Sequence, residues 1–176
     1  MNAITMNSAT GFRGKLPTHG DFVQRHVAND FALAWDHWLE QALHAAQVEL
    51  GARWQAAYAA TPFWRFAFAA GVCGETSCIG VMAPSVDRVG REFPLAVVRR
   101  IDCEPLQAAC GDPTWFAAVE AALATARQGG YASIDDFDEA LQAIATPLPL
   151  AVKEPYAPGD SELRGSHGLA AWAGAI

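Results

Sequence analysis

Two glycine-containing segments carry most of the residues that could do chemistry. Residues 84–91 read PSVDRVGR, and residues 11–22 read GFRGKLPTHGDF. Ser85 and Asp87 in one segment, with His19 and Asp21 in the other, are the residue types of a nucleophilic triad. No serine stands in the GxSxG pattern that exposes a nucleophile on a sharp turn, so hydrolysis is the least favoured of the functions considered.

Phosphate-loop and metal-site motifs fit the sequence no better. Gly14 and Lys15 resemble the end of a phosphate-binding loop, but the glycine six positions before the lysine and the serine or threonine after it are missing. His37 and His44 would lie on nearly the same helix face, yet the HExxH zinc signature is absent. We therefore expect neither a metal nor a cofactor.

The same two segments could instead form a binding surface. Pro84 and Gly90 are typical of a tight loop, from which Arg88 and Arg91 would project cations. In one interpretation, Asp87 pairs with an arginine and holds the connection. In the other, the arginines join cations of the first segment in a positive patch for an acidic or phosphorylated partner. The predicted partner-binding residues are Arg13, Lys15, Asp21, Ser85, Asp87, Arg88 and Arg91.

The charge of the chain argues against nucleic acid as a partner. Twelve basic and nineteen acidic residues give a net charge of -7, the wrong sign for holding a phosphate backbone. Residues 1–100 carry a net charge of +1 and residues 101–176 a net charge of -8. A basic surface therefore belongs to the first part of the chain.

Cysteine spacing and hydropathy indicate a cytoplasmic protein. Cys73, Cys78, Cys103 and Cys110 match neither zinc-site nor redox pairs, so we expect reduced thiols. The N-terminal residues lack the charged and apolar stretches of a secretory signal, and no apolar run reaches the roughly 18 residues of a membrane span.

The spacing of apolar residues predicts one α/β domain. The 176 residues suit a single core. A strand near Phe12 leads into an irregular connection, and helices are expected from Asp30 to Leu50 and over 53–60. Asp30 is the expected cap of the long helix, and Gly51 its end. Strands are expected over 63–69, 78–83 and 93–100, with connections too short for parallel crossovers, so neighbours should pair antiparallel.

Helical spacing returns after residue 110. Asp112 and Pro113 predict one helix start, Gly129 and Gly130 its end, and Ser133 the start of another helix. The predicted fold is a three-layer αβα sandwich with a central mixed or antiparallel sheet. Its core should be filled by six aromatic residues, the alternative being a partner-binding stripe: Trp35, Trp38, Trp54, Trp64, Phe66 and Phe68. We expect the domain to span 1–150, and 151–176 to be a Pro/Gly-rich acidic extension that packs loosely or adds an edge strand.

Four motifs resemble those of the TagF family, also called ImpM, of type VI secretion-associated proteins. They are GFRGKLPTHGDF at 11–22, WDHWL at 35–39, PFWRF at 62–66 and VMAPSVDRVGREFPL at 81–95. The resemblance covers residues 11–100 closely. It implies a three-layer α/β sandwich and a cytoplasmic, non-enzymatic accessory protein that restrains the secretion machine after translation, together with the system's forkhead-associated scaffold protein. It supplies no catalytic residues.

Three functions follow as hypotheses. The leading one is an interaction protein that binds a secretion-system component through the two loops and keeps the apparatus inactive. The second is a sensor of a small molecule or phosphopeptide, with a pocket against residues 84–91. The third is a hydrolase that uses Ser85 and His19.

Overall fold

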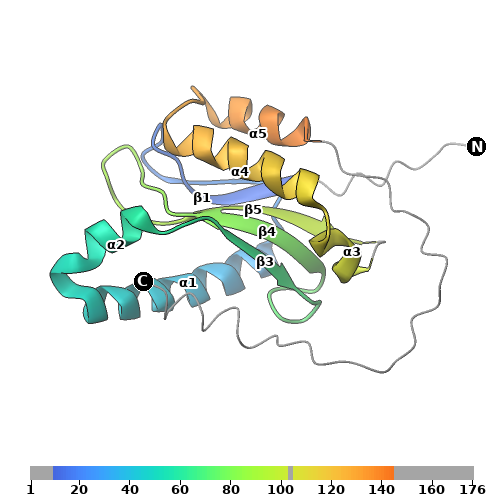
Figure 1. The fold of residues 1–176 in the computed structure, drawn as a ribbon, viewed down its shortest axis with the longest axis horizontal. Helices are drawn as coiled ribbons and strands as arrows, with labels where there is room; N and C mark the ends of the chain where they lie inside the picture. The colour runs from blue at the N-terminus through green and yellow to red at the C-terminus, as the bar shows by residue number, and fades with distance from the viewer. Residues whose placement is uncertain (1–9, 103–104, 145–176) are drawn as a thin grey trace, which may run out of the picture.

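Residues 10–102 and 105–144 are described by a computed structural model, in which helices flank a five-stranded sheet (Figure 1). The strands are β1 (Thr10–Lys15), β2 (Phe22–Arg25), β3 (Trp64–Phe68), β4 (Ser77–Ala83) and β5 (Leu95–Ile101). The helices are α1 (Asn29–Leu50), the short 3₁₀ helix η1 (Gly51–Arg53), α2 (Trp54–Ala60), α3 (Leu106–Cys110), α4 (Pro113–Arg127) and α5 (Ile134–Gln142). The expected α/β class is confirmed.

Every strand pairing in the sheet is antiparallel. The strand order is β2-β1-β5-β4-β3, so β1 lies beside β5 although many residues separate them in the chain. The antiparallel pairing expected of the three predicted strands, now β3, β4 and β5, is confirmed, with Val81 opposite Val97 and Phe66 opposite Gly80. The parallel pairs that a mixed sheet would require do not occur among the described strands.

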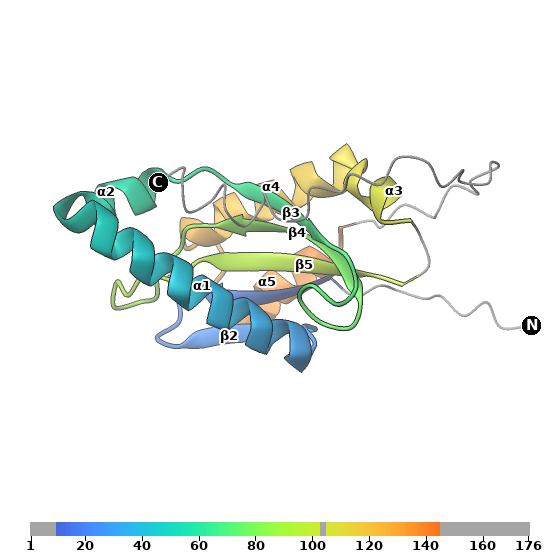
Figure 2. The same ribbon diagram turned by 90° about the horizontal axis from the view of Figure 1, so that it is seen from below.

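Helices cover both faces of the sheet. Helices α1 and α2 lie against one face, and α4 and α5 lie against the other (Figures 1 and 2). Val81 and Val97 face the core beneath α4 and α5, whereas Met82 and Ala96 face the core beneath α1 and α2. Coverage of both faces explains why β4 and β5 are almost continuously buried rather than alternately buried and exposed.

Most predicted helix ends are confirmed by their local geometry. Gly51 ends α1 with a φ of 53°, a conformation that costs glycine little. Asp112 accepts a hydrogen bond from the Trp115 N–H, and Pro113 occupies the first turn of α4. Ser133 forms a reciprocal capping box with Asp136 at the start of α5.

The predicted cap of α1 is wrong. Ala28 occupies the cap position, and Asp30 lies inside the first turn. Its Oδ2 accepts a hydrogen bond of 2.7 Å from the Glu75 backbone N–H, which lowers the pKa of Asp30. Asp30 therefore ties the β3–β4 connection to the start of α1, a long-range contact that local spacing does not reveal.

Three regular elements were not predicted. Strand β2 has four residues within the segment expected to be irregular, η1 has three residues, and α3 has five. All three are too short for a clear periodic pattern. The predicted extension 151–176 and Cys103 lie outside the described residues.

The six aromatic side chains expected in the core belong to the cluster between α1 and the sheet, two of them buried and four partly buried against it. Trp35 is 1% exposed, and its ring centroid lies 5.6 Å from that of Phe31 and 4.9 Å from that of Phe66. Trp54 is buried in the same core, and Trp64 packs against it. These rings join helix and sheet, as expected of core residues.

Replacing Trp35 tests that role. Trp35→Ala should lower the free energy of unfolding by about 3–5 kcal/mol, because it removes a buried ring and leaves a cavity. Leu33→Ala on the same helix should change it by less than about 0.5 kcal/mol, because Leu33 is 74% exposed. Urea unfolding followed by far-ultraviolet circular dichroism gives both free energies. Equal losses of unfolding free energy in the two variants would contradict the assignment of Trp35 to the core.

Candidate functional site

The connection between β4 and β5 is organised around the buried carboxylate of Asp87, which is 2% exposed. Its Oδ2 accepts hydrogen bonds from Lys15 Nζ at 3.0 Å and from Arg91 Nε at 2.6 Å. Its Oδ1 accepts from the backbone N–H groups of Val89 at 3.0 Å and Arg91 at 2.9 Å. We call Lys15, Asp87 and Arg91 the Asp87 cluster.

The backbone of residues 87–91 closes into a tight turn around this carboxylate. The Gly90 N–H donates to Asp87 O at 2.9 Å, and the Asp87 N–H donates to Arg91 O at 3.1 Å. Gly90 has a φ of 84°, which explains a glycine at this position. Lys15 reaches the turn from the end of β1. One carboxylate thus joins two segments that lie far apart in the sequence.

Hydrogen bonding sets the protonation state of Asp87. Loss of hydration on burial acts to raise its pKa, but the hydrogen bonds from Arg91, Lys15 and Val89 outweigh that effect. The pKa of Asp87 is therefore held well below its usual value. The carboxylate is ionised at neutral pH and draws both cations toward it.

Ser85 holds the base of the loop. Its Oγ donates to Lys15 O at 2.7 Å, and its backbone N–H donates to the Tyr58 hydroxyl oxygen at 3.0 Å. The Tyr58 hydroxyl in turn donates to Ser85 O at 2.9 Å. His19 Nδ1 lies 3.0 Å from Thr18 Oγ1. The hydroxyl of Ser85 is thus directed to a backbone carbonyl.

The two exposed arginines of the loop both lie beside Gly20. Arg91, whose side chain is 60% exposed, donates from Nη2 to Gly20 O. The Arg88 N–H donates to His19 O at 2.8 Å, and Arg88 Nη2 lies 3.4 Å from where a Cβ on Gly20 would stand. Val89 between them is 69% exposed. We call Arg88 and Arg91 the arginine pair.

Arg13 forms its ion pair outside the Asp87 cluster. Its guanidinium pairs with Asp36 of α1, including an Nε to Oδ1 contact of 2.7 Å, and donates to Gln24 Oε1. Because these contacts tie β1 to α1, Arg13 is held apart from the arginine pair. Asp21 is exposed, and its Oδ1 accepts from the Phe22 N–H at 2.9 Å.

Phe22 is a surface residue that sequence reasoning missed. It is 43% exposed, and its ring lies 5.2 Å from Lys15 Nζ and 5.7 Å from the Arg13 guanidinium carbon. Its edge also packs on Phe93, with ring centroids 4.8 Å apart. The sequence feature that could have identified Phe22 is its position directly after Gly20 and Asp21. The exposed surface of residues 19–22 and 84–91 is called the loop surface below.

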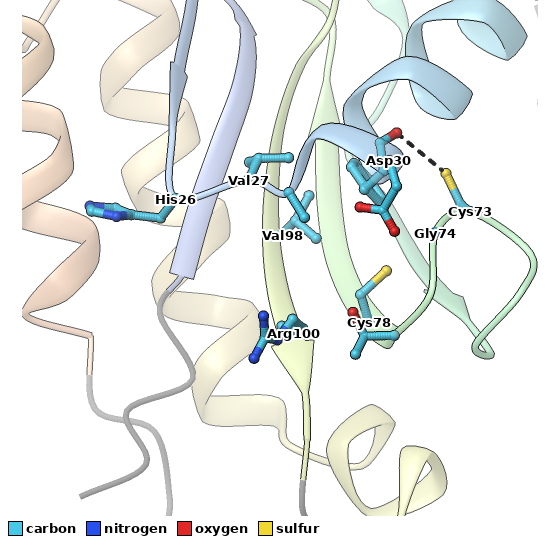
Figure 3. A pocket seen from close by; sticks show the side chains of 11 residues that line it. His26, Val27, Asp30, Cys73, Gly74, Cys78, Val98 and Arg100 are labelled. Carbon is cyan, nitrogen blue, oxygen red and sulfur yellow. Dashed lines mark hydrogen bonds between the residues drawn. The ribbon is translucent and has the colours of Figure 1, made fainter.

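A pocket of about 60 Å³ lies at the opposite end of the sheet (Figure 3). The antiparallel register places Ser77 and Ile101 at that end and Ala83 and Leu95 beside the 84–91 loop. At the base of the loop itself, a gap lined in part by Pro84 has no room for a water-sized molecule. The pocket therefore does not lie where the sensor hypothesis expects it.

The pocket wall includes two free thiols. Cys73 Sγ lies 3.9 Å from Phe31 O, the contact dashed in Figure 3. Burial raises the pKa of Cys73 to about 11 and that of Cys78 to about 12, so both stay protonated at neutral pH. Cys110 is also free and is exposed.

Residues 10–102 and 105–144 contain neither a metal-binding cluster nor a membrane-spanning helix. No group of three or more histidine, cysteine or acidic side chains there could hold a metal ion. No helix in the same residues has the length and apolar character needed to cross a membrane.

Comparison with known families defines the class as a type VI secretion system-associated domain. A model described as the TagF N-terminal domain matches residues 11–144. The chain belongs to the TagF family, as its four motifs indicate.

A solved structure supports the same relationship. The crystal structure of PA0076 from Pseudomonas aeruginosa PAO1 is similar, with a TM-score of 0.72 and 40% sequence identity. The similarity covers 79% of this chain and 64% of that chain, so this protein spans less than two thirds of the Pseudomonas protein. A search of curated proteins gave no match.

The depressed pKa of Asp87 predicts a pH-dependent contribution to stability. That contribution is complete above the unfolded-state pKa of about 3.9 and is lost as the pH falls from there through the folded-state pKa. Asp87→Asn should therefore destabilise the protein at pH 7, and its difference from wild type should shrink below about pH 4.

Urea unfolding at several pH values measures this difference. Asp21→Asn is the matched control, because Asp21 is an exposed carboxylate in the adjoining loop. It should change stability little at either pH. A difference between Asp87→Asn and wild type that is the same at pH 7 and pH 3 would contradict the buried charge pairing.

Proposed function

We propose that this protein is a cytoplasmic, post-translational repressor of the type VI secretion system. It acts by binding a component of the system, the forkhead-associated scaffold protein, and keeps the apparatus inactive. Family membership supports the association with this system. The observation that carries the binding site is the arginine pair, two exposed cations on a turn that the buried carboxylate of Asp87 holds.

The Asp87 cluster suits the loop surface to recognition. Four hydrogen bonds to one carboxylate fix the turn before a partner arrives, so less conformational freedom is lost on binding. Arg88 and Arg91 project from this fixed turn, and arginine is favoured at protein interfaces. Rigid support beneath exposed arginines is what a binding loop needs.

A binding role without catalysis also agrees with the contacts of Ser85. A nucleophilic serine needs a base within hydrogen-bonding reach of its hydroxyl. Here the hydroxyl donates to Lys15 O at 2.7 Å, and the backbone of Ser85 is held by Tyr58. These contacts support a structural role for Ser85, and we assign the protein no reaction.

Charge reversal of the arginine pair tests the proposal. The double variant Arg88→Glu, Arg91→Glu should bind the scaffold protein at least about 30-fold more weakly than wild type, equivalent to about 2 kcal/mol for buried interfacial charges. Biolayer interferometry with immobilised scaffold gives the dissociation constants. Because Arg91 also contacts Asp87, the single variant Arg88→Glu is measured beside it and should weaken binding in the same direction.

Arg53→Glu is the matched control, because Arg53 is exposed and lies in η1, outside the residues of the loop surface. It should bind as wild type does. Thermal unfolding of every variant separates lost binding from lost folding. Undiminished scaffold binding by the folded double variant would remove the loop surface from consideration, and no binding by wild type would refute the proposed partner.

A further inference from the structure

The charges around Gly20 sum to zero but are unequally paired. Lys15, Arg88 and Arg91 bring three positive charges, and Asp87, Asp21 and Glu92 bring three negative ones. Lys15 and Arg91 both pair with Asp87, and Glu92 accepts a hydrogen bond from the Trp54 indole. The positive charge of Arg88 is therefore the one that no acid pairs within residues 10–102 and 105–144.

Both guanidinium groups of the arginine pair lie beside Gly20. Arg91 uses Nε for Asp87 and Nη2 for Gly20 O, and its side chain remains 60% exposed. The Arg88 guanidinium lies over Gly20, where no side chain intervenes, and it forms no ion pair with the part of the chain that the structure describes. Planar guanidinium groups in such a place match the two oxygens of a carboxylate.

An apolar contact lies beside this charged position. Phe22 follows Gly20 and Asp21 directly, and its ring is held by Lys15 on one side and by the Phe93 ring. A ring that is fixed and still 43% exposed can accept an apolar side chain with little loss of freedom. A ligand that reaches both features carries an acidic and an apolar residue next to each other.

We propose that the arginine pair binds a single carboxylate side chain, from an acidic peptide segment whose neighbouring apolar residue packs on Phe22. A carboxylate matches the single positive charge of Arg88 that no acid of the described residues pairs. A doubly charged phosphate would exceed that charge and would face the exposed carboxylate of Asp21. This inference rests on the proposed function, because it names the chemistry by which a partner protein is recognised at the same surface.

Short blocked peptides test this chemistry on the full chain. The probes are acetyl-Leu-Glu-Leu-amide, its glutamine analogue and its phosphoserine analogue, titrated while the arginine Nε–H signals are followed by nuclear magnetic resonance. The glutamate peptide should shift the signals of Arg88 and Arg91 saturably, and the glutamine peptide should bind at least about tenfold more weakly. Arg88→Gln should weaken glutamate-peptide binding about tenfold, whereas Arg53→Gln should leave it unchanged.

The role of Phe22 has its own variant. Phe22→Ala should weaken the glutamate peptide several-fold and should have a smaller effect on acetate, which has no apolar neighbour. Equal binding of the glutamate and glutamine peptides, or no shift of either arginine, would overturn the carboxylate site. Binding of the phosphoserine peptide more than about tenfold tighter than the glutamate peptide would also overturn it, in favour of a phosphate site.

Scaffold binding measured in parallel distinguishes this inference from the proposed function. If the glutamate peptide binds more tightly than the glutamine peptide but the scaffold protein does not bind, the carboxylate site is supported and the proposed partner is refuted. If the scaffold protein binds and this binding needs the arginine pair, but the two peptides bind equally, the proposed function is supported and the carboxylate site is overturned.

Discussion

The buried carboxylate of Asp87 is the constraint on which the loop surface depends. A charge removed from water is stable only when it is paired and hydrogen-bonded, and Asp87 meets that condition with Lys15, Arg91 and two backbone N–H groups. The cost of exposing or unpairing this charge keeps the end of β1 and the β4–β5 connection together. The backbone N–H groups of residues 87–91 are hydrogen-bonded, so the conformation of this loop is fixed.

The same contacts divide the cations of the first part of the chain by role. Lys15 and Arg13 are engaged in contacts that join elements of the fold, with Asp87 and Asp36 respectively. Arg88 and most of the Arg91 side chain remain exposed. The two interpretations of residues 84–91, as a connection held by an ion pair and as a positive surface, are therefore compatible. The pairing that holds the connection leaves the two arginines exposed.

Elements with strong local signals could be predicted, and those set by tertiary contacts could not. The long helix α1 and strands β4 and β5 follow from apolar spacing, and Ser133 and Asp112 mark helix starts by capping. The contact of Asp30 with the β3–β4 connection depends on residues far away in the sequence, and the short strand β2 is set by its pairing with β1. For the same reason the segments of the site could be named from sequence, whereas the diversion of Arg13 to Asp36 and the exposure of Phe22 required the structure.

Hydrogen–deuterium exchange on the protein with and without the scaffold protein tests the central claim most directly, because it reports which surface the partner covers. The account predicts slower exchange in segments 17–22 and 84–92 on binding, with residues 26–31 and 72–78 around the pocket unchanged. Slower exchange confined to the pocket end of the sheet, with the loop surface unaffected, would contradict it.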